Sequence, residues 1–167
     1  MTTHRPGRVM RAILRAPTVL YDWRLGWLFG HRFLRIDHTG RRSGRCYRTM
    51  VEVLRIDPAS GEIVVMAGLG EKTDWLRNIR AGGPAQVAIG SRRFAASHRI
   101  LAEPEAVAVL AEYERRNRLA TPVVRRVLSW LTGWRYDGTP DSRRRLVRQL
   151  PLVGLSAKGR ATKHIGR

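Results

Sequence analysis

The sequence predicts an α+β protein built on a mainly antiparallel β-barrel, with helices at the barrel ends. Segments with the composition of strands come in groups of three, two and one, separated by helical segments, whereas a doubly wound parallel sheet would alternate strands and helices regularly. Turn residues connect neighbouring strands closely enough for hairpins. The 167 residues, 43% of them hydrophobic, suffice for one core and are too few for two.

The first expected element is a basic amphipathic helical segment in residues 1–32. Apolar side chains recur there at three- and four-residue steps, and Pro17 interrupts them, which predicts one broken helix or two short ones. Arginines alternate with tryptophans, a mixture typical of helices that lie on a membrane surface. The alternative is that the aromatic side chains pack on the barrel while the arginines face solvent.

Three strands follow, over residues 33–38, 46–56 and 62–67. Residues 39–44 form the first turn, and the Asp-Pro-Ala-Ser-Gly run at 57–61 forms the second. The third strand has consecutive apolar residues, as a strand buried on both faces does. Cys46 is the single cysteine, so an internal disulfide is excluded, and we expect it to be a small buried side chain rather than a nucleophile.

The second half of the sequence predicts a short helix, a hairpin, three further helices and a last strand, in this order. Thr73 and Asp74 can cap a helix over 74–79, and the next hairpin has strands over 85–89 and 92–101. Pro104 starts a helix ending near residue 117, and two more helices are expected over 121–132 and 141–149. A strand over 150–155 closes the barrel domain, residues 33–156, and 157–167 form a basic, disordered tail.

The charge balance favours an anionic partner, although solvated arginine-rich faces of a basic protein are the alternative for part of the excess. The chain has 32 Lys and Arg against 13 Asp and Glu, a formal net charge of +19. Such a field favours encounter with nucleic acid, an anionic membrane or a phosphorylated cofactor. Because arginine dominates, bidentate contacts to phosphate or carboxylate are favoured over point charges. No spanning segment and no signal peptide are evident, so we expect a cytoplasmic protein, with peripheral contact at the inner face of the cell membrane as an option.

The turn at residues 39–45, Thr-Gly-Arg-Arg-Ser-Gly-Arg, has the composition of an anion cradle. Its glycines let backbone amides approach an oxyanion, and its arginines and serine add charge-assisted hydrogen bonds. The alternative is a solvated hairpin turn, and a Walker motif is excluded because the spacing and the following helix are missing. The five histidines are scattered without ligand spacing, so no metal site is expected.

The run Thr39-Gly40-Arg41-Arg42-Ser43-Gly44, followed by Ala67-Gly68 and then by Asp-Trp-Leu-Arg-Asn-Ile-Arg-Ala at 74–81, resembles the deazaflavin-dependent nitroreductase family. The resemblance covers about residues 34–155. It implies a split β-barrel of the FMN-binding type and reduction by coenzyme F420, an 8-hydroxy-5-deazaflavin that carries hydride and has a phosphate and an oligoglutamate tail.

The resemblance also implies roles for particular residues. Residues 41–43, assisted by 48 and 49, would hold the phosphate and the acidic tail. Residues 66–68 would lie along the deazaflavin ring, and 72, 74 and 75 would close the loop over it. The expected cofactor-binding residues are Thr39, Gly40, Arg41, Arg42, Ser43, Gly44, Arg48, Thr49, Met66, Ala67, Gly68, Lys72, Asp74, Trp75 and Asn78. Trp75 has the alternative of a core residue, Asp74 of a helix start, and Asn78 of a tie to neighbouring backbone.

Two tyrosines are candidates for the proton donor that a reductase needs when hydride arrives. Tyr113 and Tyr136 lie in the C-terminal region where the family places its substrate-facing tyrosines, although the best-known members carry several closely spaced ones there. Tyr113 has the alternative of a packing residue on a helix, and Tyr136 lies in a glycine-flanked loop.

The expected function is therefore an F420H2-dependent oxidoreductase that passes hydride to an electron-poor acceptor such as a quinone, a nitroaromatic or a conjugated carbonyl. FMN in place of F420 stays open, as does monomer against dimer. One alternative function is a non-catalytic split-barrel protein that binds a lipid or flavin at a membrane. Another, less favoured because no recognised binding module is present, is a basic protein that binds nucleic acid without specificity.

Overall fold

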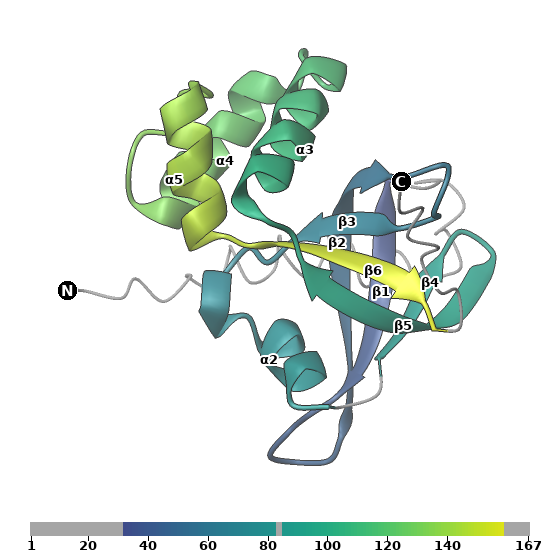
Figure 1. Cartoon of the computed structure of the whole chain (residues 1–167). Helices are drawn as coiled ribbons and strands as arrows, with labels where there is room; N and C mark the ends of the chain where they lie inside the picture. Colours follow the sequence, from purple (N-terminus) through teal and green to yellow (C-terminus); the bar gives the residue numbers. More distant parts are fainter. Residues whose placement is uncertain (1–31, 83–84, 159–167) are drawn as a thin grey trace.

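Six antiparallel strands close into one barrel in the order β1-β2-β3-β6-β5-β4 (Figure 1). The computed structural model describes residues 32–82 and 85–158. The strands are β1 Phe33–Thr39, β2 Cys46–Ile56, β3 Ile63–Met66, β4 Ala85–Ile89, β5 Arg92–Ile100 and β6 Leu152–Ala157. The expected antiparallel barrel is confirmed. The expectations for residues 1–31 and for the end of the tail lie outside the described residues.

The helices occupy two places on the barrel. A short 3-10 turn, η2 Gly70–Lys72, leads into α2 Asp74–Arg80, which packs against β1. The other three helices gather together on one side of the barrel, apart from α2 (Figure 1). They are α3 Glu103–Arg116, α4 Thr121–Thr132 and α5 Pro140–Gln149. Each has a proline in its first turn, where the missing N–H costs nothing, and α4 ends at Gly133 with φ of 78°.

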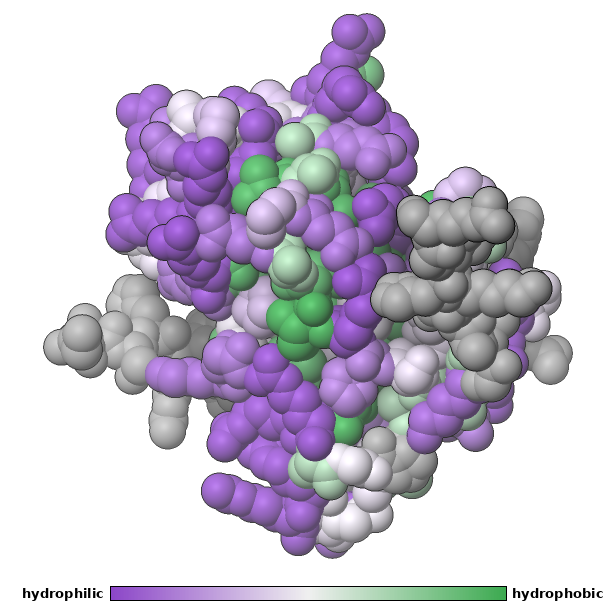
Figure 2. Space-filling view, in the orientation of Figure 1, coloured by the Kyte–Doolittle hydropathy of each residue, from purple (hydrophilic) through white to green (hydrophobic). Residues whose placement is uncertain are grey.

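Two apolar clusters result from strand alternation. On β1 and β2 one row of side chains faces the barrel interior, where it meets α2 and the inner rows of the other strands. On β2, β3 and β6 the opposite row contacts α3, α4 and α5. β3 contributes to both clusters and is buried at Ile63, Val64 and Val65, as expected for a strand covered on both faces. Figure 2 shows a mostly hydrophilic surface on which apolar residues emerge in a narrow band.

Three local expectations differ from the structure. Cys46 is exposed rather than buried, because it begins β2 at the barrel end, where no helix covers it. The last strand runs over 152–157 instead of 150–155, since the Leu150 N–H still bonds to Leu146 O at the end of α5. Thr73 stands at the N-cap of α2, but its hydroxyl accepts from Leu69 N rather than from the helix.

Candidate functional site

The bend between β1 and β2 is a closed turn stabilised by its own backbone. Gly40 N donates to Arg45 O, and Gly44 N donates to Gly40 O, each at 2.8 Å. A Cβ at position 40 would lie 2.6 Å from both Ser43 Oγ and Tyr47 Cε2, so any other residue there would displace these two side chains. Gly44 adopts φ of 65°, a conformation that glycine reaches without strain.

This bend docks on α2, and Figure 1 shows the two side by side. Asn78 Oδ1 accepts from Arg41 N at 3.1 Å and from Arg41 Nη1 at 2.9 Å. Arg41 Nη1 also lies 3.3 Å from Asp74 Oδ1. Consequently the Arg41 side chain is only 21% exposed. Arg41 thus holds one side of the bend against the helix, while residues 42–45 are exposed.

The inner row of β1 changes from apolar to polar at the bend. Leu34, Ile36 and His38 alternate along β1 and are all buried. Their partners on β2 are Val51, Thr49 and Tyr47, and the His38 and Tyr47 rings stack with their centroids 5.9 Å apart. The apolar barrel interior therefore ends in a polar rim of histidine, threonine and tyrosine.

A chain of hydrogen bonds connects this rim to α2, and the donor and acceptor of each bond can be assigned. Because a guanidinium only donates, Asn78 turns its oxygen toward Arg41 and its Nδ2 toward His38 Nδ1, 2.9 Å away. His38 Nδ1 must then accept, so the proton of the neutral ring is on Nε2, which donates to Thr49 Oγ1 at 3.2 Å. The hydroxyl hydrogen of Thr49 is thereby left to donate elsewhere.

His38 is neutral at pH 7. Burial lowers its pKa from 6.5, while the carboxylates of Asp74 and Asp37 act in the opposite direction without reversing the shift. The accepting role of Nδ1 is consistent with this protonation state.

A pocket of about 440 Å³ lies between the bend, the strand ends and α2. It is rich in donors of the kind that bind oxyanions, since its lining has three guanidinium groups and three hydroxyls against a single carboxylate. Its lining residues are His38, Gly40, Arg41, Arg42, Ser43, Tyr47, Arg48, Thr49, Asp74 and Asn78. We call it the bend pocket.

The pocket brings together eight of the expected cofactor-binding residues, namely Gly40, Arg41, Arg42, Ser43, Arg48, Thr49, Asp74 and Asn78. Its lining does not include the other expected residues, which are Thr39, Gly44, Met66, Ala67, Gly68, Lys72 and Trp75. Ala67 and Trp75 belong to the barrel core, so Trp75 has the position of its packing alternative. Met66 packs beside the helical cluster, and Lys72 is exposed in η2. Strand polarity nevertheless puts residues 66–68, at the end of β3, at the same barrel end as the bend.

A second hollow of about 680 Å³ adjoins the bend pocket. Its lining includes Thr39, the exposed Cys46 and Gln86 on β4. The two hollows share His38, Tyr47 and Arg48. The stacked His38 and Tyr47 rings therefore form a common wall.

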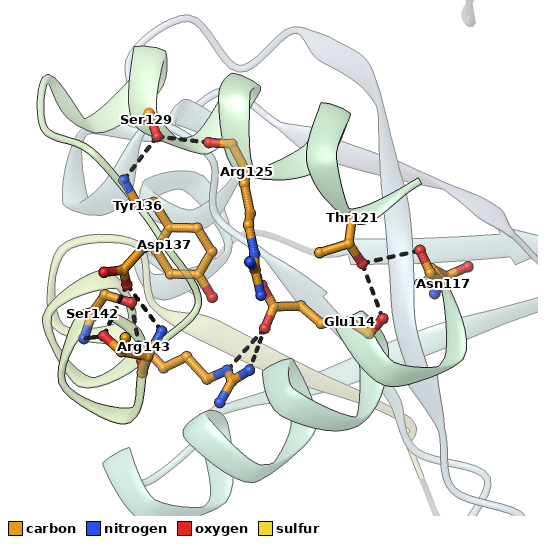
Figure 3. A network of polar contacts seen from close by, with 10 residues as sticks. Glu114, Asn117, Thr121, Arg125, Ser129, Tyr136, Asp137, Ser142 and Arg143 are labelled. Atoms are coloured by element: carbon orange, nitrogen blue, oxygen red, sulfur yellow. Dashed lines mark hydrogen bonds and ion pairs between the residues drawn. The ribbon is translucent and has the colours of Figure 1, made fainter. Parts of the chain in front are cut away.

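The tyrosines expected to be catalytic lie elsewhere. Tyr113 is 4% exposed and donates to Glu52 Oε1 at 2.6 Å, on the side of β2 that faces α3. Tyr136 is 2% exposed and lies beside Glu114, Arg125 and Arg143 in the helical layer (Figure 3). Burial raises the pKa of both phenols, which keeps them protonated. Neither lines the bend pocket or the hollow beside it.

His38 and Tyr47 are the pocket residues that sequence reasoning missed. The sequence did contain a signal for His38: residues 34, 36 and 38 alternate along β1, so all three side chains lie on the same, inward face. A histidine that ends an inward row at a glycine-bearing turn marks a polar rim. No three His, Cys, Asp or Glu side chains within the described ranges are grouped so as to hold a metal ion.

Comparison with known proteins gives a family and a fold. A family model described as F420H(2)-dependent quinone reductase matches residues 24–127. The structure of Atu2129 from Agrobacterium tumefaciens, a protein of unknown function, is similar over 95% of this chain and 60% of its own, with a TM-score of 0.51 and 16% identity. This chain thus spans less than two thirds of that protein, and the likeness concerns the fold.

Two other solved structures are similar at lower TM-scores. The F420-H2 dependent reductase FDR-A has a TM-score of 0.47 and 16% identity over 76% of this chain and 96% of its own. An FMN-binding protein from Nostoc punctiforme, related to pyridoxamine 5'-phosphate oxidase, has a TM-score of 0.47 and 14% identity over 86% and 80%. No curated protein matches the chain.

Proposed function

Since the chain belongs to the family of F420H2-dependent quinone reductases, we propose that its bend pocket binds the anionic part of F420 and that a quinone is the hydride acceptor. Family membership makes the protein an oxidoreductase with F420 as its cofactor. The proposal concerns the residues that bind this cofactor and the choice of acceptor. The supporting observation is the donor set of the pocket.

The residues of the bend pocket fit a phosphate followed by carboxylates. Arg41, Arg42 and Arg48 supply charge-assisted donors, and the Thr49 hydroxyl hydrogen is directed away from His38. Asp74 neutralises one of the three guanidinium groups, so the lining keeps an excess of positive charge. A neutral His38 adds no charge but fixes the Thr49 hydroxyl.

The bound F420H2 would supply two electrons and a proton as hydride, and the chain has to position it. Residues 66–68 stay part of the proposal as the backbone along the deazaflavin ring, supported by their place at the same barrel end. The hollow beside the bend pocket would receive the acceptor, because Tyr47 and His38 face both spaces. Tyr47, rather than Tyr113 or Tyr136, would then donate a hydrogen bond to it.

Steady-state turnover with different acceptors tests whether the acceptor is a quinone. Oxidation of F420H2 is followed by its absorbance with menadione, with a nitroaromatic and with a conjugated enone as separate acceptors. We expect the highest kcat/KM with the quinone. Equal or greater turnover with the nitroaromatic would contradict the quinone assignment, and turnover with reduced FMN alone would contradict the cofactor assignment.

Peripheral membrane contact through residues 1–32 belongs to the same proposal. Its support is the alternation of arginine with tryptophan in the sequence. No helix among the described residues has the length and apolar character needed to cross a membrane. Replacing Trp23 and Trp27 by serine in the full chain should weaken binding to anionic vesicles while leaving turnover with a water-soluble quinone unchanged.

A further inference from the structure

Helix α4 is apolar on two opposite faces. Leu128 faces the helical cluster and is buried. On the other side Leu119, Val123, Val127 and Trp130 are 93%, 66%, 48% and 47% exposed. Steps of four, four and three residues put them in one line along the helix and the turn before it. We call this line the α4 stripe.

Cationic side chains border the α4 stripe. Arg126 lies one helical turn from both Val123 and Trp130, and Arg118 directly precedes Leu119. Neither arginine forms an ion pair with any other described residue. The helix sequence, Thr-Pro-Val-Val-Arg-Arg-Val-Leu-Ser-Trp-Leu-Thr, contains no acidic residue.

We propose that the α4 stripe is a docking surface for an anionic lipid bilayer, with α4 lying in the plane of the interface. Aliphatic side chains would enter the acyl boundary, Trp130 would lie at the headgroup level, and the bordering arginines would contact lipid phosphates. This surface is separate from residues 1–32 and lies in the described part of the chain.

Charge disfavours two other occupants of the stripe. Residues 1–31 contain five arginines and one acid, Asp22, so they carry the same sign of charge as the border of the stripe. A second copy of the chain brings a further formal charge of +19. An anionic surface is complementary in charge, and the aliphatic stripe favours lipid over nucleic acid, which offers no apolar layer of comparable depth.

Arg32 lies close to the start of the α4 stripe. The described chain begins at Arg32, which lines a hollow together with Arg116 and Asn117. These two residues end α3 and immediately precede the stripe. Arg32 therefore lies near the end of α3 that leads into the stripe.

The test measures partitioning of the full chain, without cofactor, by cosedimentation with vesicles. One set of vesicles is phosphatidylcholine alone, and the other is an equimolar mixture with phosphatidylglycerol. We expect the double variant Val127→Ser/Trp130→Ser to bind the anionic vesicles at least about tenfold more weakly than wild type. The control Leu69→Ser/Ile100→Ser changes two comparably exposed apolar residues outside α4 and should bind like wild type.

Charge is tested in the same way. Arg126→Gln should reduce binding to the anionic vesicles about fivefold and leave binding to phosphatidylcholine unchanged. Arg92→Gln, on β5, is the matched control. Because every changed side chain is exposed, the variants should keep the wild-type melting temperature, which circular dichroism checks.

Two outcomes would overturn the proposal. One is unchanged vesicle binding by Val127→Ser/Trp130→Ser. The other is conversion of a dimer to a monomer by that variant, seen by light scattering, which would identify the stripe as a subunit contact. A short DNA duplex can be added as a competitor of vesicle binding. If the duplex binds the variant and the wild type equally well, DNA binding belongs to arginines outside the stripe, and the vesicle measurement alone decides the proposal. None of these outcomes depends on F420 binding.

Discussion

At the scale of single residues, Asn78 sets the direction of the hydrogen bonds in the bend pocket. Arg41 can only donate, so the Asn78 amide has one orientation, and this fixes the His38 tautomer and the Thr49 hydroxyl. The sequence offered Asn78 as a cofactor residue or as a tie to neighbouring backbone. In the structure it bonds to the Arg41 backbone, and 37 residues separate the two, a pairing that no local pattern encodes.

Replacing Asn78 by aspartate tests this orientation. A carboxylate would still accept from Arg41, but it would face His38 Nδ1 with a second acceptor, which favours a protonated ring. We expect the pKa of His38, lowered in the wild type, to rise above 6.5 in Asn78→Asp. Histidine chemical shifts measured against pH by NMR check this, with Asn117→Asp as the control. An unchanged His38 pKa would contradict the hydrogen-bond chain.

Stability should fall as the pH drops through the range in which His38 takes up a proton. Its folded-state pKa lies below the ordinary 6.5, so the unfolded chain binds the proton more readily, and folding loses free energy as the pH decreases below about 6.5. Urea unfolding of the wild type and of His38→Gln at a series of pH values measures the difference. Parallel pH dependence of the two proteins would show that His38 is not responsible.

Tyr47 is the tyrosine whose loss should slow the reaction. Its ring lines both hollows and its hydroxyl lies 3.1 Å from Ser43 Oγ. If it donates a proton or hydrogen bond to the reduced acceptor, Tyr47→Phe should lower kcat by about a hundredfold with little change in F420 affinity. Tyr136→Phe should leave kcat near the wild-type value, and the reverse ranking in steady-state kinetics would restore Tyr136 as the donor.

At the scale of elements, periodicity and capping chemistry predicted nearly every helix and strand. Prolines mark the starts of α3, α4 and α5, and Gly133 ends α4, so these boundaries are encoded locally. The start of β6 was misplaced because Leu150 has strand composition but remains bonded to α5. Trp75 and Tyr136 show a related difficulty, since an aromatic residue in a core and one in a site have the same local sequence signal.

The three C-terminal helices are joined by a buried carboxylate. Glu114 on α3 is 4% exposed and lies 2.6 Å from Arg143 on α5 and 3.4 Å from Arg125 on α4 (Figure 3). Glu114→Gln would leave the partly buried Arg143 without its counterion, and we expect a loss of about 3 kcal/mol in the free energy of unfolding. Glu112→Gln, on an exposed part of α3, should be neutral in the same urea titration. Equal changes in the free energy of unfolding for the two variants would mean that the ion pairs of Glu114 do not stabilise the helices.

At the scale of the whole molecule, the net charge of +19 predicted an anionic partner but could not say where it binds. The structure concentrates three guanidinium groups around the bend pocket and others along α4 and α5. The barrel brings the bend, β2 and α2 to one end, and this closure depends on long-range strand pairing. Composition and motifs therefore predicted the chemistry of the ligand, whereas the polar rim of His38 and Tyr47 could be recognised only once the strand register was known.

The affinity of purified protein for F420, followed by the cofactor's fluorescence at low salt, is the most direct test of the bend pocket. Arg41→Ala/Arg42→Ala should raise Kd about a hundredfold or more, because two charge-assisted hydrogen bonds are lost. Arg45→Ala removes one positive charge from the same bend without touching the pocket lining and should change Kd only about twofold. Equal weakening by both variants, or binding that survives the loss of Arg41 and Arg42, would show that the bend pocket does not hold the anionic end of the cofactor.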